Sequence, residues 1–301
     1  KKLQGDWRKV QGNFGDSGGQ QDLSGIARYS SLEDLLEDPR VDLLDICLPT
    51  PMHTGSTLQA LEAGKHVFLE KPIALNLSDA DRMIAAAKKR KLCFMVAHVL
   101  RFMPEFRLIK ELVVNKKYGR IQAAHFKRII SRPSWWDPKI LAQNGGPAID
   151  LHIHDADFVQ YLFGMPQAVS SNGFMERGQM VEYLDTHYHY EGRSLAIGAE
   201  GGWLSQSGCP FEHGYDVYFQ DATLKYNSSS GEPPILLSKD GKKRRPRLPG
   251  RDGFVGELQE AVDAVRAGKV AKDLSGQSAR NSLLLCLREI QSVRSGRRVR
   301  I

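Results

Sequence analysis

The chain has 301 residues, of which 41% are hydrophobic and 26% charged, so it has the composition of a globular protein and room for two domains. No apolar run approaches the roughly 18–20 residues that a bilayer-spanning helix needs, and no signal-peptide pattern opens the sequence. We therefore expect no membrane partner. The net charge of +7 raises the question of nucleic-acid binding.

Most of the excess charge comes from one short segment. Residues 239–251 hold seven basic residues and one acidic residue, which contribute +6 of the +7. The segment also contains two prolines and two glycines, which is typical of a mobile, solvated connection. No aromatic residue interleaves with these charges, so the sequence predicts no nucleic-acid partner.

The cysteines are far apart and form no paired spacing. They are Cys47, Cys93, Cys209 and Cys286. This spacing favours neither disulfides nor a metal site, so we expect four reduced thiols and a cytoplasmic setting.

Short apolar runs alternate with helical segments in the first third of the chain. The expected order is helix 31–37, strand 41–48, helix 54–63, strand 66–69, helix 78–89 and strand 92–96. Units of this length predict a Rossmann-type, doubly wound parallel sheet with right-handed crossovers. Ligands bind beyond the carboxyl ends of such strands, where residues 49–53, 70–72 and 97–101 fall.

The pattern changes after Gly119. Alternating segments rich in aromatic and β-branched residues predict strands of a large open, mainly antiparallel sheet, at 121–129, 182–190 and 215–219. A helix interrupts these strands near residue 150, and a helix pair at about 254–267 and 275–295 ends the chain. The sequence therefore predicts a nucleotide-binding domain over 1–119 and a second α/β domain over 120–301.

Three residues carry the predicted chemistry. Lys71 follows the apolar strand at 66–69 and precedes Pro72, which fixes its direction. Asp150 and His154 are four residues apart, so on one helix they project from the same face. Together they supply a cation, a carboxylate and a proton acceptor, which suit removal of a hydroxyl proton while a hydride leaves the same carbon. The competing interpretations are a surface lysine, a carboxylate near a helix N-terminus and a core histidine.

A metal site is not expected at this cluster. His152 lies on the opposite helix face from Asp150 and His154. Histidines two residues apart on a helix cannot ligate one ion, so the sequence predicts no metal ligand here.

Three stretches carry a resemblance to a known family. They are Asp45-Ile-Cys-Leu-Pro-Thr-Pro-Met-His53, Ala63-Gly-Lys-His-Val-Phe-Leu-Glu-Lys-Pro72 and residues 145–157. With them the chain resembles the Gfo/Idh/MocA family of glucose–fructose oxidoreductase and inositol dehydrogenase. The resemblance implies a domain that binds NAD or NADP, a sugar or cyclitol substrate, and a homodimer or homotetramer formed through the open sheet. It also places Lys71, Asp150 and His154 at the family's catalytic positions.

The sequence departs from this family at its start. Gly12, Gly15 and Gly18 do not have the spacing of the Gly-rich turn that holds a pyrophosphate, and Asn13 stands where an acidic residue usually binds the ribose. Either the chain lacks about 30 residues, the size of one βαβ unit, or it binds cofactor poorly. We expect the former, because a sheet without its central strand should be unstable.

The remaining site residues are predicted from their place at the strand ends or in the second domain. The predicted cofactor contacts are Asn13, Pro49, Thr50, Pro51, His53, Glu70, Lys71 and Arg101. The predicted substrate contacts are Lys71, Arg101, Trp135, Asp150, His154 and His187. Two other functions stay open: a glycoside hydrolase or lyase that uses a transient redox step, and a non-catalytic ligand-binding homologue.

Overall fold

The structure is a computed structural model that describes residues 25–132, 142–176 and 180–301. Contacts divide the chain into two compact units, with the boundary between Val41 and Asp42. The predicted contacts Asn13 and Trp135 lie outside the described residues. None of the described helices is long and apolar enough to cross a bilayer.

The first unit contains one described helix, α1 (Leu32–Glu37). It begins where the sequence predicts a capped helix, because the Ser31 hydroxyl accepts a hydrogen bond from the backbone N–H of Asp34. Beyond the helix, the Asp38 carboxylate accepts hydrogen bonds from Tyr29 and Arg40. Through Asp38 these contacts connect the residues before α1 to those that follow it.

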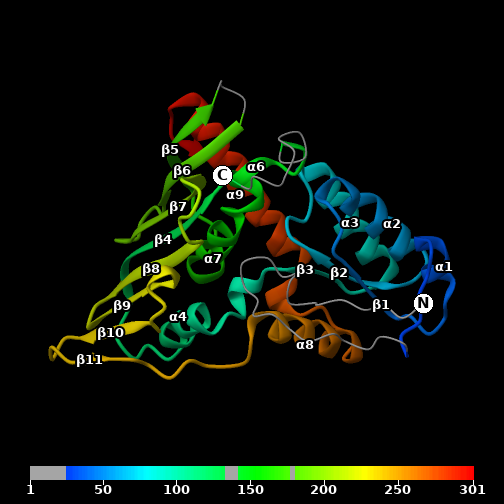
Figure 1. Cartoon of the computed structure of the whole chain (residues 1–301), viewed down its shortest axis with the longest axis horizontal. Helices are drawn as coiled ribbons and strands as arrows, with labels where there is room; N and C mark the ends of the chain where they lie inside the picture. Colours follow the sequence, from blue (N-terminus) through cyan, green and yellow to red (C-terminus); the bar gives the residue numbers. More distant parts are fainter. Residues whose placement is uncertain (1–24, 133–141, 177–179) are drawn as a thin grey trace. The chain divides into compact units, whose positions relative to one another are not determined.

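The second unit opens with the parallel sheet that the sequence predicts. Its strands are β1 (Leu43–Ile46), β2 (His66–Glu70) and β3 (Phe94–Ala97), paired in that order. Helices α2 (His53–Glu62) and α3 (Leu77–Arg90) connect them (Figure 1). Because the strands are parallel, the residues that follow each one meet at a single edge of the sheet.

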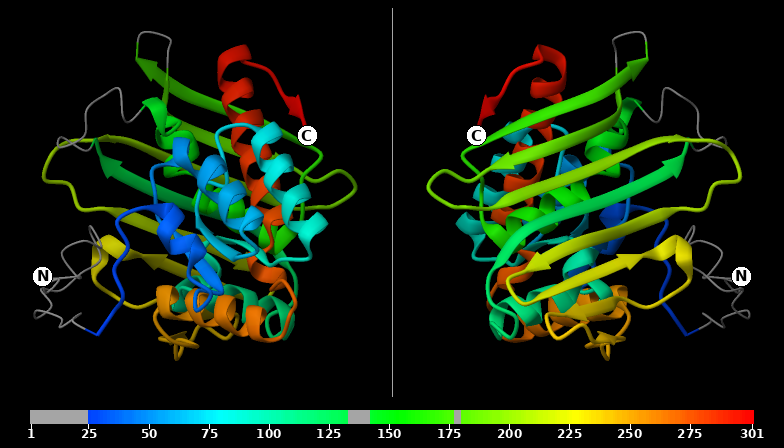
Figure 2. Two further views of the ribbon diagram at one scale, coloured as in Figure 1. Left: turned by 90° about the vertical axis from the view of Figure 1, so that its right-hand side faces the viewer. Right: turned by 90° about the vertical axis from the view of Figure 1, so that its left-hand side faces the viewer.

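A nine-stranded mixed sheet follows. Its strands are β4 (Ile121–Ser131), β5 (Ala168–Glu176), β6 (Met180–His189), β7 (Ala196–Ser205), β8 (Glu212–Phe219), β9 (Ala222–Asn227), β10 (Ile235–Ser238), β11 (Lys243–Arg244) and β12 (Val299–Arg300). Their order is β11-β10-β9-β8-β4-β7-β6-β5-β12, and β4 with β7 is the parallel pair. Helices of the same unit lie against one face, and Figure 2 (right) shows the other face of this sheet without a helix over it in the described chain.

Aromatic rings join the helices to the mixed sheet. Phe106 of α4 (Pro104–Val114) makes edge-to-face contacts with Phe158 and Tyr215, at ring-centroid distances of 5.2 and 5.3 Å. Phe126 of β4 contacts Phe158 at 5.7 Å. This cluster fixes α7 (Ile153–Phe163), on which Phe158 lies, against the centre of the sheet.

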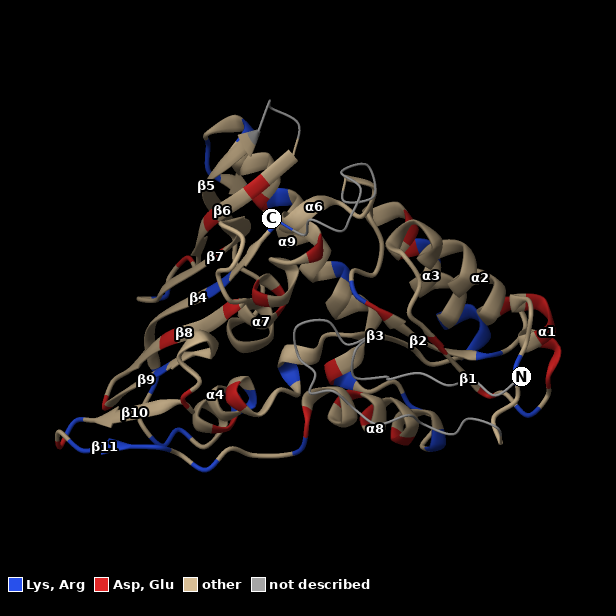
Figure 3. Ribbon diagram, viewed as in Figure 1, with Lys and Arg blue, Asp and Glu red and all other residues tan. Residues whose placement is uncertain are grey.

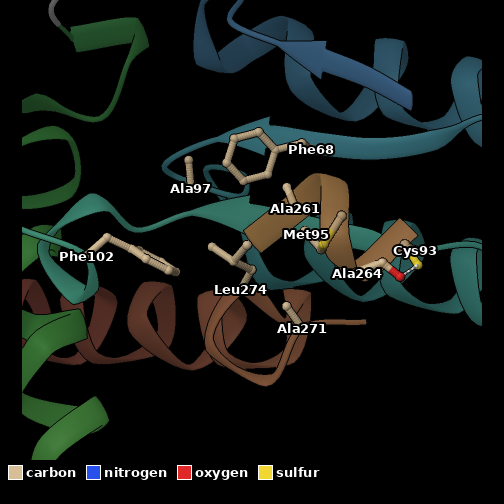
Figure 4. Packing of buried hydrophobic residues seen from close by; sticks show 9 residues of the cluster. All are labelled: Phe68, Cys93, Met95, Ala97, Phe102, Ala261, Ala264, Ala271 and Leu274. Atoms are coloured by element: carbon tan, nitrogen blue, oxygen red, sulfur yellow. Dashed lines mark hydrogen bonds between the residues drawn. The ribbon is translucent and has the colours of Figure 1, made fainter. Parts of the chain in front are cut away.

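The last helices return to the parallel sheet. Ala261 of α8 (Gly253–Arg266) and Leu274 pack against Phe68 and Met95 (Figure 4). Helix α9 (Gly276–Ser295) then contacts β3 as well as β5 and β6 of the mixed sheet. The division into domains at residue 119 stays a prediction. It assigns α8 and α9 to the second domain, but α8 packs in the core of the parallel sheet and α9 contacts β3.

The basic segment at 239–251 is exposed along most of its length. Part of it forms β11, which pairs with β10, and Arg245 forms an ion pair with Glu232. Figure 3 shows its positive charges strung along this edge and the connection to α8. The exposure agrees with the solvated connection predicted from sequence.

We predict that Gly202→Ala destabilises the protein, because β6 and β7 approach too closely there for a side chain. A Cβ atom at Gly202 would lie 2.5 Å from the carbonyl oxygen of Glu182 and 2.7 Å from Cα of Tyr183. Since both are backbone atoms, the strands must shift, at a cost of about 2 kcal/mol or more. Urea denaturation measures the change.

The matched control is Gly55→Ala. This residue lies in α2 with nothing within 4 Å of the new Cβ, so the variant should gain about 0.5 kcal/mol. Equal stability of the two variants would contradict the close approach of β6 and β7.

Candidate active site

Lys71 directly follows β2, and its side chain reaches the end of α6 (Gly146–Asp150). Its Nζ donates hydrogen bonds to the carbonyl oxygen of Asp150 at 2.5 Å and to Oδ1 of Asp150 at 2.8 Å. The Lys71 side chain is 18% exposed and the Asp150 side chain 37%. The lysine is therefore fixed by a neighbour but still accessible, and the peptide bond to Pro72 is cis.

Asp150 and His154 do not share one continuous helix, which corrects the sequence prediction. Helix α6 (Gly146–Asp150) ends at Asp150, and α7 begins at Ile153. The His154 N–H faces the carbonyl oxygen of Leu151 rather than that of Asp150. Since the Asp150 carbonyl is released from the helical pattern, it can accept the hydrogen bond from Lys71.

His154 is partly buried in the first turn of α7. Burial lowers the pKa of His154 well below its ordinary value, and the positive charges of Lys71 and Arg128 add to the effect. Its Nδ1 is buried and has no hydrogen-bond partner among the described residues. A neutral imidazole with a free nitrogen is a proton acceptor at neutral pH.

The residues after β1 are held in place by side-chain contacts. Ring nitrogens of buried His53 lie 2.7 Å from the carbonyl oxygen of Leu48 and 2.9 Å from that of Pro72. The Thr50 N–H donates to Oδ1 of Asn144 at 3.2 Å. His53 therefore joins the ends of β1 and β2, which is a structural role beside the cofactor contact predicted for it.

Two exposed prolines complete the segment after β1. Pro49 and Pro51 flank Thr50 in a short 3₁₀ turn at Thr50–Met52. Both remain predicted cofactor contacts, since they lie on the surface at the sheet edge where the parallel strands end.

Carboxyl groups gather on the same side of the parallel sheet. Glu70 follows Leu69 at the end of β2, and burial raises the pKa of its carboxyl. Glu257 of α8 is 2% exposed, and burial together with the charges of Glu70 and Asp45 raises the pKa of its carboxyl to about 9. Glu257 therefore carries a proton at neutral pH.

Arg101 is not available as the sequence prediction requires. It is 4% exposed, and its guanidinium donates to both carboxylate oxygens of Asp157, to the Ser278 hydroxyl and to the carbonyl oxygen of Asp273. These four bonds occupy the planar donor face that would bind a ligand. The geometry gives Arg101 a structural role, which joins the residues after β3 to α7 and α9.

His187 lies away from the other site residues, against the expectation of a shared pocket. It is exposed on β6, between the buried residues Thr186 and Tyr188. Successive strand residues face opposite sides of a sheet, and Tyr188 contacts His152 on the helix-covered side. His187 therefore faces the open side of the sheet, opposite Asp150 and His154.

The sequence analysis did not select His98 as a site residue. It follows β3, and its Nδ1 lies 3.5 Å from Oδ1 of Asp157. Burial lowers the pKa of His98 to about 4, so the ring is neutral. His98 lies in the segment 97–101, which the sequence places beyond the end of a strand, as it does Lys71. Arg101 was chosen from that segment because of its charge.

Comparison with known proteins identifies the family. A family model described as "Oxidoreductase family, NAD-binding Rossmann fold" matches residues 16–98, and one described as "GFO/IDH/MocA C-terminal domain" matches residues 106–225. The chain belongs to the GFO/IDH/MocA family. It is an NAD(P)-dependent oxidoreductase, so the predicted family, fold class and class of cofactor are confirmed.

Relatives with assigned activities cover much of the chain. It is 27% identical to the myo-inositol 2-dehydrogenase of Thermotoga maritima, over 91% of this chain and 84% of that protein. It is 32% identical to the 1,5-anhydro-D-fructose reductase of Ensifer adhaerens, over 75% of this chain and 70% of that protein. It is also 34% identical to the 2,7-anhydro-N-acetylneuraminate hydratase of Escherichia coli, over 81% of this chain but 59% of that protein.

Solved structures share the fold at lower sequence identity. Levoglucosan dehydrogenase in complex with NADH and levoglucosan aligns with a TM-score of 0.79 and 18% identity, over 91% of this chain and 83% of that one. A probable dehydrogenase from Thermotoga maritima aligns with a TM-score of 0.76 and 24% identity, over 90% and 84%.

The described residues fit the reactive end of a nicotinamide cofactor. Lys71, bonded to Asp150, lies near enough to His154 to lower its pKa, and it follows a parallel strand at the sheet edge where such a fold binds nucleotides. No group of three or more histidine, cysteine, aspartate or glutamate side chains in the described ranges is arranged to hold a metal ion.

We predict that Arg101→Gln lowers the free energy of unfolding by about 3 kcal/mol or more, because it leaves buried Asp157 without its cation. Arg280→Gln is the control, since the Asp81 carboxylate that it pairs with is about half exposed. Chemical denaturation of both variants measures the effect. A stable Arg101→Gln protein with weakened cofactor binding would contradict the structural role and support the ligand contact predicted from sequence.

We predict that Glu257→Gln is more stable than the native protein at high pH. The folded protein keeps a proton on Glu257 that the unfolded chain releases above its ordinary pKa of 4.5, so stability falls as the pH rises toward 9. The variant avoids this loss and should be more stable by about 2–4 kcal/mol at pH 8, and little changed at pH 5.

Urea denaturation at both pH values measures the Glu257 effect. Glu260→Gln serves as the control, because this carboxylate is exposed on the same helix. A stability difference for Glu257→Gln that does not vary with pH would contradict the buried, protonated carboxyl.

Proposed function

We propose that the protein is a dehydrogenase that acts on a secondary hydroxyl of a sugar, a cyclitol or a related polyol, with Lys71, Asp150 and His154 as its catalytic residues. The observation that supports it is the bond from Lys71 Nζ to Asp150, beside the neutral His154, at the edge of the parallel sheet. This group combines a fixed cation with a proton acceptor.

Each residue has a separate task. His154 takes the hydroxyl proton on an imidazole nitrogen, and Lys71 donates a hydrogen bond to the oxygen on which negative charge develops. Asp150 holds the Lys71 ammonium in one direction through its carbonyl and carboxylate oxygens. Bound NAD or NADP supplies the acceptor for the hydride, and the alcohol carbon becomes a carbonyl.

The substrate class is supported by the relatives. Their names include a myo-inositol, a scyllo-inositol and a 1,5-anhydro-D-fructose enzyme. These compounds are polyhydroxylated rings, so a site that reacts with one ring hydroxyl suits all of them. Thr50, Pro51 and Glu70 are the proposed contacts of the cofactor beside Lys71.

The setting of the protein is part of the same proposal. We place it in a reducing compartment such as the cytoplasm, because all four cysteines are free. We propose a homo-oligomer, for which the open face of the mixed sheet offers the surface (Figure 2).

We predict that Lys71→Ala lowers kcat for polyol oxidation by about 10²-fold or more, because the developing charge on oxygen loses its hydrogen-bond donor. NADH or NADPH formation at 340 nm with myo-inositol, scyllo-inositol and levoglucosan measures turnover. Lys89→Ala is the control, since this lysine is exposed on α3.

Two results would count against the function. Undiminished turnover in Lys71→Ala would remove the lysine from the mechanism. Consumption of a substrate without net NADH or NADPH would instead favour a reaction with a transient redox step.

A further inference from the structure

The break between α6 and α7 separates Asp150 from His154, so the two residues are not held by the hydrogen bonds of one helix. The His152 N–H bonds to the carbonyl oxygen of Pro147, five residues back, and the His154 N–H faces Leu151 at 3.4 Å. In a continuous α-helix the His154 N–H would bond to Asp150. No backbone hydrogen bond joins residue 150 directly to residue 154, so side-chain contacts at the break contribute to the placement of the Asp150 and His154 side chains.

A buried ion pair lies at this break. Nε2 of His152 is 3.1 Å from Oε2 of Glu289 on α9, and both side chains are 0% exposed. His152 stands two residues after Asp150 and two before His154, so a movement of its side chain shifts both. Glu289 belongs to the helix that also contacts the parallel sheet, which carries Lys71.

Neighbouring strands pack closely around the imidazole ring of His152. A Cβ atom on Gly201 of β7 would lie 2.7 Å from Nδ1 of His152 and 3.0 Å from its Cβ, so the ring rests directly on a strand that has no side chain there. The Tyr188 hydroxyl of β6 lies 3.5 Å from Nε2. The imidazole is held between two strands and Glu289.

The charges around the pair are balanced. Asp155 of α7 forms its own buried ion pair with Arg128 of β4 at 2.6 Å. Burial alone would lower the pKa of His152, but the Glu289 carboxylate outweighs it, so the pKa of His152 is raised. Glu289 thus raises the pKa of His152, whereas burial and nearby positive charges lower the pKa of His154.

We propose that His152 and Glu289 are positioning residues, which hold the α6–α7 break so that Asp150 meets Lys71 while His154 keeps a free nitrogen. This inference rests on the proposed function, since Lys71, Asp150 and His154 are the residues it positions. Neither member of the pair needs to touch the substrate or the cofactor.

The test is Glu289→Gln, which keeps the size of the side chain and removes its charge. We expect kcat to fall by about 10-fold or more, because misplacement by about 1 Å can cost a factor of 10². KM for the cofactor should stay unchanged. The pH at which activity is half-maximal should also move, because His154 is displaced.

Two further variants separate loss of positioning from general loss of stability. The double variant His152→Gln/Glu289→Gln pairs two amides that can hydrogen-bond, so it should recover several-fold in kcat over Glu289→Gln. Leu283→Ala is the control for general loss of stability, because Leu283 is also fully buried on α9. Native kcat in Glu289→Gln, or an equal loss in Leu283→Ala at equal stability, would overturn the proposal.

An NMR measurement separates this inference from the proposed function. If the native protein oxidises none of the polyols, the function fails, but histidine imidazole titrations still report on the pair. Glu289→Gln should lower the pKa of His152 and shift the imidazole signal of His154. An unchanged His154 signal would overturn the positioning role.

Discussion

The bond from Lys71 Nζ to the carbonyl oxygen of Asp150 joins the end of the parallel sheet to the helices on the mixed sheet. It exists because α6 stops at Asp150, so the carbonyl that a longer helix would use is left for the lysine. Together with the bond from Lys71 to Oδ1 of Asp150, it leaves the third ammonium hydrogen for a substrate oxygen. A local irregularity of the backbone thus creates the donor geometry, and the surrounding structure must maintain it.

That support comes from side chains of a single short segment. Residues 152–157 send three buried polar groups to three different elements. His152 reaches Glu289 on α9, Asp155 reaches Arg128 on β4, and Asp157 reaches Arg101 after β3. Each buried charge has an opposite charge beside it, which limits the cost of removing it from water. His154 is the residue of this segment that we propose for proton transfer, and it takes part in none of these three ion pairs.

The sequence was sufficient for the strands of the parallel sheet and for part of the mixed sheet. The alternation of strands and helices predicted β1 to β3, and the alternating segments predicted β4, β6 and β8 of the mixed sheet. It failed where the outcome depends on contacts between remote residues. Nothing near Arg101 reveals that Asp157 occupies its guanidinium, and nothing near Asp150 reveals that Lys71 competes for its carbonyl. His187 was misplaced for another reason, since alternation predicts two faces but does not say which of them the helices cover.

The packing of α8 and α9 on the parallel sheet affects how the chain is made. Phe68 and Met95 are synthesised long before Ala261 and Leu274, whose side chains cover them (Figure 4). At about 5–20 residues per second, this face of the sheet waits on the order of ten seconds for its cover. We expect chaperones to meet it during that interval. Removal of α8 and the segment before α9 therefore takes away part of the core of the parallel sheet, although these residues are far from its strands in the sequence.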